Sequence, residues 1–116
     1  MNGEKEITGS VHYLEKVALL PGSTLVVSLL DVTQPSAPVT LASEVYADLD
    51  PDFMEYALTF EMAKLQYGHT YSIDARILYD DRVVFASAQQ PALDLSEESL
   101  WIKDVRVQIV SVSTYA

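Results

Sequence analysis

Residues 65–85 read LQYGHTYSIDARILYDDRVVF, and this stretch decides the fold class. Its opening, Leu65-x-x-Gly68-x-x-Tyr71, has the spacing of a tyrosine corner, in which a Tyr near the start of a strand hydrogen-bonds to backbone a few residues upstream. Apolar and polar residues then alternate from Tyr71 to Tyr79, the pattern of a half-buried strand. Residues 80–82 reverse the chain, and residues 83–85 begin the return. The stretch predicts a corner and a hairpin of a β-sandwich.

Further strand-like segments lie on both sides of this stretch. We expect them at residues 7–13, 25–30, 39–48, 56–62 and 100–109, with turn signals about every ten residues. In the segment 39–48 the side chains expected to face the core are Val39, Leu41, Val45 and Ala47, whereas Tyr46 is expected to face out. The fold class is all-β: an antiparallel β-sandwich of about seven strands, immunoglobulin- or transthyretin-like, with little helix. A small barrel is the alternative, because strand number does not decide closure.

Length and composition indicate one domain. The chain has 116 residues, of which 49% are hydrophobic, so a real core is possible without disulfides. We expect residues 1–6 to be a flexible N-terminal segment and residues 7–116 to form a single domain. The sequence contains no cysteine, no apolar run long enough to span a bilayer and no signal peptide.

The charge balance excludes some classes of partner. Seven basic and seventeen acidic residues give a net charge of −10. Such a surface repels phosphate backbones and anionic lipid, so we expect no nucleic-acid binding. A basic protein partner, or simple solubility, fits the charge better.

The acidic turn is the first candidate for site chemistry. Asp48, Asp50 and Asp52 alternate like the first three ligands of a calcium loop. The EF-hand pattern then needs Gly and Glu at positions that are Phe53 and Thr59 here. We therefore expect a solvated acidic turn and no metal site.

The remaining polar residues do not form a recognisable catalytic set. His12 falls on the polar side of the first strand and His69 in the corner, and we interpret both as surface or turn residues. The sequence has no G-x-S-x-G and no glycine-rich phosphate loop. We expect no catalytic residues, no cofactor and no enzyme activity.

Apolar residues on the outer side of strands are a better lead. If Val27 and Leu29 face the core, their neighbours face out. The candidates for a partner-binding surface are accordingly Val26, Leu30, Leu78 and Val84. A contiguous set would provide a groove for a helix or an added strand.

The amino-acid sequence of these strands also resembles that of a known family. The run GSVHYLEKVALLPGSTLVVSLLDVTQPSAPVTLAS, followed by LQYGHTYSIDARILYDDRVVFAS, resembles the YscW/YbaY-like small bacterial lipoproteins. The shared features are the V-x-Y start, A-L-x-P-G-S-x-L-x-V-x-L-x-D-V, A-P, Y-x-I-x-A-R-I and V-F ahead of a Pro. The likeness covers about residues 7–95 and consists of structural motifs.

The resemblance implies a function. The family includes pilotins, the secretin pilot proteins of type III secretion systems. They bind the C-terminal region of a secretin subunit and aid its outer-membrane targeting and assembly. The resemblance therefore implies a chaperone without catalysis, lipid-anchored on the periplasmic face of the outer membrane. The edges of the sandwich could pair two chains, but we expect a monomer. The family's lipidated Cys is absent, and the simplest account is that Met1 replaces a signal peptide and that Cys. The alternative is an envelope lipoprotein of the same fold with a small-hydrophobic-ligand or stress role.

Overall fold

A computed structural model of the chain describes residues 3–14, 18–34, 36–50, 52–66, 68–87, 102 and 104–110. In order, its elements are β1 (Glu4–His12), β2 (Thr24–Asp31), β3 (Val39–Tyr46), β4 (Glu55–Glu61), the short 3-10 helix η1 (Met62–Lys64), β5 (Tyr71–Tyr79), β6 (Arg82–Ser87) and β7 (Val105–Ile109). The predicted fold class is confirmed.

Some predicted boundaries differ from the structure. β1 begins at Glu4, inside the segment expected to be flexible, because residues 4–6 pair with β4. Ile102 makes one isolated bridge with Thr8 and does not belong to β7. The rest of the strand segment expected at 100–109 is described only in part, because Lys103 and residues 88–101 lie outside the described residues.

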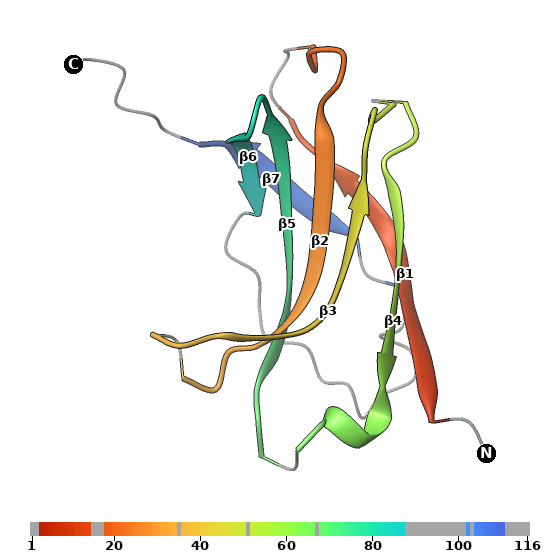
Figure 1. The fold of residues 1–116 in the computed structure, drawn as a ribbon, viewed down its shortest axis with the longest axis vertical. Helices are drawn as coiled ribbons and strands as arrows, with labels where there is room; N and C mark the ends of the chain where they lie inside the picture. Colours follow the sequence, from red (N-terminus) through yellow and green to blue (C-terminus); the bar gives the residue numbers. More distant parts are fainter. Residues whose placement is uncertain are drawn as a thin grey trace.

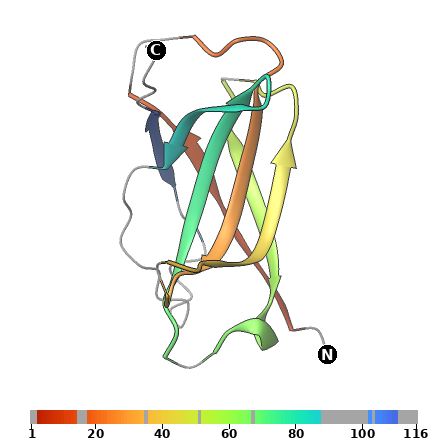
Figure 2. The ribbon, with the colours of Figure 1, turned by 60° about the vertical axis from the view of Figure 1, so that its left-hand side comes forward.

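The described strands follow one another around the molecule in the order β3-β2-β5-β6-β7-β1-β4. Figure 2 shows β1 and β4 behind the layer formed by β3, β2, β5 and β6. Their pairings are antiparallel except between β1 and β7, which run parallel at Val11–Val105 and His12–Arg106. The seven described strands thus form a sandwich-like arrangement that also curves like a barrel. It differs from the expected antiparallel sandwich in the parallel pairing of β1 with β7.

The core lies between these layers and comes mainly from alternate residues of β2, β4, β5 and β7. Thus Leu25, Val27 and Leu29 of β2 are fully buried, while the residues between them are only half-buried. This alternation has the period of two that is typical of a strand with one buried face. Other fully buried apolar side chains are Ile7, Leu58, Ala75, Ile77, Val105 and Val107.

A bulge in β3 reverses the predicted facing of its second half. The register of β2 with β3 shifts between Leu29 and Leu30, which leaves Leu41 as the extra residue. Beyond the bulge Tyr46 packs against the core, and Val45 has 63% of its surface exposed. The prediction that Val45 faces in and Tyr46 out was wrong, because an extra residue exchanges the two faces of a strand.

The predicted tyrosine corner is confirmed. The Gln66 amide donates to the Tyr71 hydroxyl at 2.7 Å, and that hydroxyl lies 3.4 Å from the Gln66 carbonyl oxygen. Gly68 has a φ of +85°, which glycine adopts without steric cost. Tyr71 is buried, so its hydroxyl ties the start of β5 to the segment before it.

Replacing this hydroxyl tests the corner. Tyr71→Phe should lower the free energy of unfolding by about 1 kcal/mol, because the Gln66 amide loses its acceptor. Urea denaturation at equilibrium measures the change as a lower midpoint with an unchanged slope. Tyr79→Phe, at an exposed strand end, is the control and should leave the midpoint in place. Equal midpoints for Tyr71→Phe and the parent protein would contradict the structural role of the hydroxyl.

Candidate partner-binding surface

The outer face of the β3-β2-β5-β6 layer carries a line of apolar side chains. Val45 of β3 stands opposite Val26 of β2. Leu78 lies on the same face two residues beyond Arg76, the partner of Val26, and is therefore its diagonal neighbour. Leu78 in turn stands opposite Val83 of β6. We call these four residues, which cross four strands, the outer band.

The structure brings together two of the four predicted candidates, Val26 and Leu78. Leu30 shares their face, but it lies four residues from Val26, or about 13 Å along the strand. Polar pairs occupy the space between them: the Ser28 and Ser43 hydroxyls lie 3.1 Å apart, and Arg76 donates to Asp74 at 3.0 Å.

Val84 does not face out as predicted. The register of β5 with β6 shifts so that Ile77 pairs with Phe85 and Leu78 with Val83, which leaves Val84 as the extra residue. Val84 is half-buried and packs against the core. The outward position in β6 belongs to Val83, so a bulge again reversed the predicted facing.

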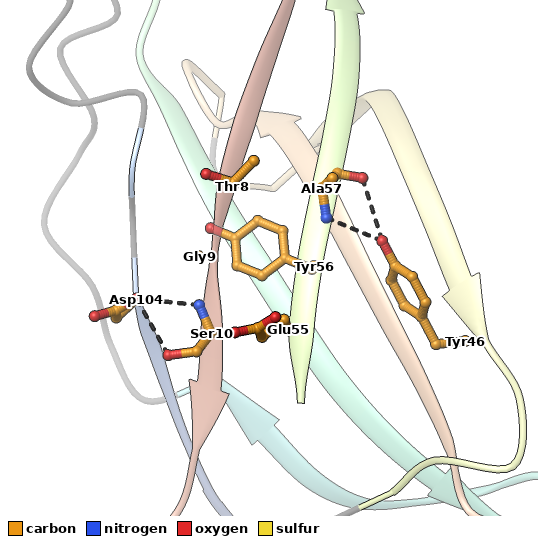
Figure 3. A pocket seen from close by; sticks show the side chains of 8 residues that line it. All are labelled: Thr8, Gly9, Ser10, Tyr46, Glu55, Tyr56, Ala57 and Asp104. Atoms are coloured by element: carbon orange, nitrogen blue, oxygen red, sulfur yellow. Dashed lines mark hydrogen bonds between the residues drawn. The ribbon is translucent and has the colours of Figure 1, made fainter. Parts of the chain in front are cut away.

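A second feature is an open hollow of about 600 Å³ beside the β1–β4 ladder (Figure 3). It is lined by Thr8, Gly9 and Ser10 of β1, Glu55, Tyr56 and Ala57 of β4, Tyr46 and Asp104. The Ser10 amide and hydroxyl donate to Oδ1 of Asp104 at 3.0 and 3.2 Å. This fixes a carboxylate at the rim of the hollow.

Tyr46 joins two strand edges at this hollow. Its hydroxyl accepts from the Ala57 amide at 3.0 Å and donates to the Ala57 carbonyl at 3.2 Å. Tyr56 stands opposite Gly9, and its ring lies beside this residue of β1 (Figure 3). Burial raises the pKa of the Tyr56 hydroxyl above its ordinary value, and the negative charge of Asp104 adds to the effect. The Tyr56 hydroxyl is therefore less easily ionised than that of an ordinary tyrosine.

The two histidines have different surroundings. His12 is exposed, as expected. The Nδ1 of His69 lies 2.5 Å from Oδ2 of Asp31, whose Oδ1 accepts from the Thr33 amide at 3.0 Å and from the Thr33 hydroxyl at 2.5 Å. Hydrogen bonds lower the pKa of Asp31 to about 2. The Thr33 hydroxyl has the largest effect, followed by His69 and then by the Thr33 amide. The group ties the end of β2 to the corner before β5, which is a structural role.

The acidic turn shows no metal-binding geometry. The Asp50 side chain accepts from the Asp52 amide at 2.9 Å, which is a local turn contact. No three acidic or His side chains among the described residues converge to hold a metal ion. In the same part of the chain no helix is long and apolar enough to cross a bilayer.

Comparison with known proteins identifies the class. The family of type III secretion system lipoprotein chaperones, YscW, matches residues 2–99 of the 116. Because the match covers most of its length, the chain belongs to this family, and the resemblance seen in the sequence is confirmed. No curated protein matches the chain.

Similarity to a solved structure extends over nearly the whole chain. An alternative pilotin from the type II secretion system of Vibrio cholerae superposes with a TM-score of 0.83 at 25% sequence identity. The likeness covers 94% of this chain and 99% of that pilotin. The fold is thus shared over the full length of a secretion-system pilotin.

Several features of the surface were not predicted from the sequence. At the hollow Ser10 hydrogen-bonds to Asp104, which is 94 positions away in the sequence, and no local motif predicts such a contact. The outward position of Val83 and the inward position of Tyr46 both depend on bulges. His69 was placed correctly in the corner, but its contact with Asp31 was missed, because the two residues are 38 positions apart.

The hydrogen bonds to Asp31 predict a measurable titration. The lowered pKa of Asp31 means that the folded state favours the carboxylate over the protonated acid. The carboxylate therefore adds to the free energy of unfolding. This contribution is complete above the unfolded-state pKa of about 3.9 and is lost as pH falls toward 2. The stability difference between the parent protein and Asp31→Asn should therefore narrow from pH 5 to pH 3, measured by urea denaturation. Thr33→Val should raise the Asp31 pKa in an NMR carboxyl titration. An unchanged pKa in Thr33→Val would contradict this origin of the shift.

The contact between Tyr46 and Ala57 makes a second prediction. Tyr46→Phe should lower the free energy of unfolding by about 1–2 kcal/mol, because the Ala57 amide and carbonyl both lose their partner. Hydrogen exchange localises the effect: the Ala57 amide should exchange faster, whereas amides of β2 should keep the protection of the parent protein. Unchanged exchange at Ala57 would show that the hydroxyl does not hold the two edges together.

Proposed function

We propose that this chain is a secretin pilot protein of a type III secretion system, and that it binds the C-terminal region of a secretin subunit without catalysing a reaction. The observation that carries this proposal is the family match over residues 2–99. The full-length similarity to a pilotin of another secretion system supports it.

The outer band is the surface we propose for the contact. Val45, at 63% exposure, and the half-buried Val26, Leu78 and Val83 place apolar area on the solvent side of the layer. Single exposed apolar residues are common, but a continuous line across four strands is a feature of interaction surfaces. The apolar side of an amphipathic segment fits such a line.

In the full-length protein we propose a lipid anchor ahead of β1 that holds the domain on the periplasmic face of the outer membrane. The family is one of lipoproteins, which supports this location. The chaperone then acts as a monomer that brings its secretin subunit to the membrane.

Binding of a small hydrophobic ligand is less well supported. Sixteen apolar side chains fill the described core. The hollow beside β1 and β4 is open to solvent and has Glu55, Ser10 and Asp104 in its lining. A second, smaller hollow near Arg106 and Gln108 is also open. Neither has the enclosed apolar lining that a lipid-like ligand needs.

A direct binding experiment tests the proposal. The parent protein should bind a peptide from the C-terminal region of the secretin encoded in the same genome, measured by isothermal titration calorimetry with one peptide per chain. Val26→Thr combined with Leu78→Thr should weaken binding by roughly ten-fold, because two central apolar contacts are lost while β-branched side chains preserve the strands.

Leu30→Thr provides the matched control. It makes the same kind of change on the same face but outside the outer band, and should leave the affinity within about two-fold of the parent protein. Absence of heat and of complex formation with any secretin C-terminal peptide from that genome would refute the proposed function. Equal weakening by Leu30→Thr would instead reject the outer band as the contact.

A further inference from the structure

The outer band leads to one end of the molecule where three connections meet. They are residues 18–23 before β2, residues 47–50 and 52–54 between β3 and β4, and residues 79–82 of the β5–β6 hairpin, and we call them the loop end. Figure 1 shows all three at the upper end, while β1 begins at the lower end. The Leu49 amide donates to the Ser23 carbonyl at 2.9 Å, and Thr24 pairs with Leu78 beside the hairpin. The three connections are therefore neighbours.

Each connection of the loop end exposes a large apolar side chain. Leu20 is 53% exposed, Phe53 72% and Tyr79 38%. Hydrogen bonds hold the backbone at two of these residues. The buried Ser23 donates to the Leu20 carbonyl through both its amide and its hydroxyl. The Phe53 amide donates to the Asp50 carbonyl. Fixed apolar groups that contribute nothing to the core increase the affinity for a partner, because little ordering is needed on binding.

The same connections carry a strong negative charge. Their five aspartates are all exposed: Asp48, Asp50, Asp52, Asp80 and Asp81. Arg82 is the only basic residue in the described part of the loop end, so the net charge there is 1 − 5 = −4. The ion pairs found among the described residues, Asp31–His69 and Asp74–Arg76, lie elsewhere. A partner that covers Leu20 and Phe53 must therefore neutralise these carboxylates.

We infer that the loop end docks a cationic amphipathic segment of the partner, in which Lys or Arg residues flank a short apolar run. The apolar run covers Leu20, Phe53 and Tyr79, and the basic side chains face the aspartates. The inference rests on the proposed pilot function and specifies the chemistry of the partner that this function leaves open. Opposite charge at the rim of an apolar contact mainly raises the association rate and fixes orientation.

Three of the aspartates allow a charge test that spares the fold. Asp48, Asp80 and Asp81 have φ values of 52°, 53° and 63°, a left-handed conformation that Asn adopts at least as readily. The variant Asp48→Asn, Asp80→Asn, Asp81→Asn removes three charges from the loop end. The control variant Glu4→Gln, Glu6→Gln, Glu61→Gln removes three charges at the start of β1 and the end of β4. Both variants have a net charge of −10 + 3 = −7.

The binding measurement uses a fluorescently labelled C-terminal peptide of the secretin encoded in the same genome, and a second peptide with its Lys and Arg replaced by Gln. The loop-end variant should bind the first peptide about five- to ten-fold more weakly at low salt, with a flatter salt dependence. The control variant should bind it within about two-fold of the parent protein. The second peptide should bind the parent protein and the loop-end variant with equal, reduced affinity.

The outcomes separate this inference from the proposed function. If the parent protein does not bind the first peptide, the pilot function fails and the inference with it. If it binds, but the loop-end variant matches the parent protein or the neutral peptide binds as tightly as the basic one, only the cationic docking is overturned. Should the loop-end variant fail to fold, the comparison of the two peptides on the parent protein, with its salt dependence, still decides the matter.

Discussion

The hydroxyl of Tyr46 closes the arrangement of strands at the one junction where no β-ladder joins neighbours in the described sheet. β3 and β4 stand at the two ends of the strand order, and the Tyr46 hydroxyl bonds to both the amide and the carbonyl of Ala57. A hydroxyl can do this because it donates one hydrogen and accepts others. It thus serves both backbone groups of one residue, as a neighbouring strand would.

The same device recurs at two other edges. Tyr71 contacts both the amide and the carbonyl of Gln66 at the corner, and Ser87 bonds to the amide and carbonyl of Ala75 at 2.5 and 3.0 Å where β6 ends. Unpaired backbone groups at partly buried edges are costly. A small domain with many strand ends therefore needs such hydroxyls, and their positions decide where the connections between strands can lie. With β3 held against β4, the Leu49 amide after β3 reaches the Ser23 carbonyl before β2.

Local sequence signals were enough to predict the elements but not all of their faces. The bounds of β5 and the corner hydrogen bond follow from residues close together in the chain: an alternating pattern, a glycine and a tyrosine. The inward position of Tyr46 and of Val84 depends on bulges in β3 and β6, and a bulge is set by the pairing partner as much as by the strand itself. The parallel pairing of β1 with β7 and the contact of Ser10 with Asp104 join the two ends of the sequence, which alternation alone does not encode. The outward positions of Val26 and Leu78 were predicted correctly because β2 and β5 contain no extra residue that would exchange their faces. Val83 was missed because the bulge at Val84 exchanges the two faces of β6.

The separation of core and surface explains how one domain can be stable and still expose apolar groups. The buried residues of β2 and β5 alternate with half-buried or exposed ones, so the outer band contributes little to the core and is available for a partner. The outer band and the loop end both lie toward the end of the molecule at which β5 finishes, whereas β1 starts beside Glu61 at the other end. The nine residues of β5 separate these ends by about 30 Å. If the proposed lipid anchor precedes β1, the apolar and acidic surfaces face away from the membrane, so that a secretin subunit can bind without competing with the anchor for space.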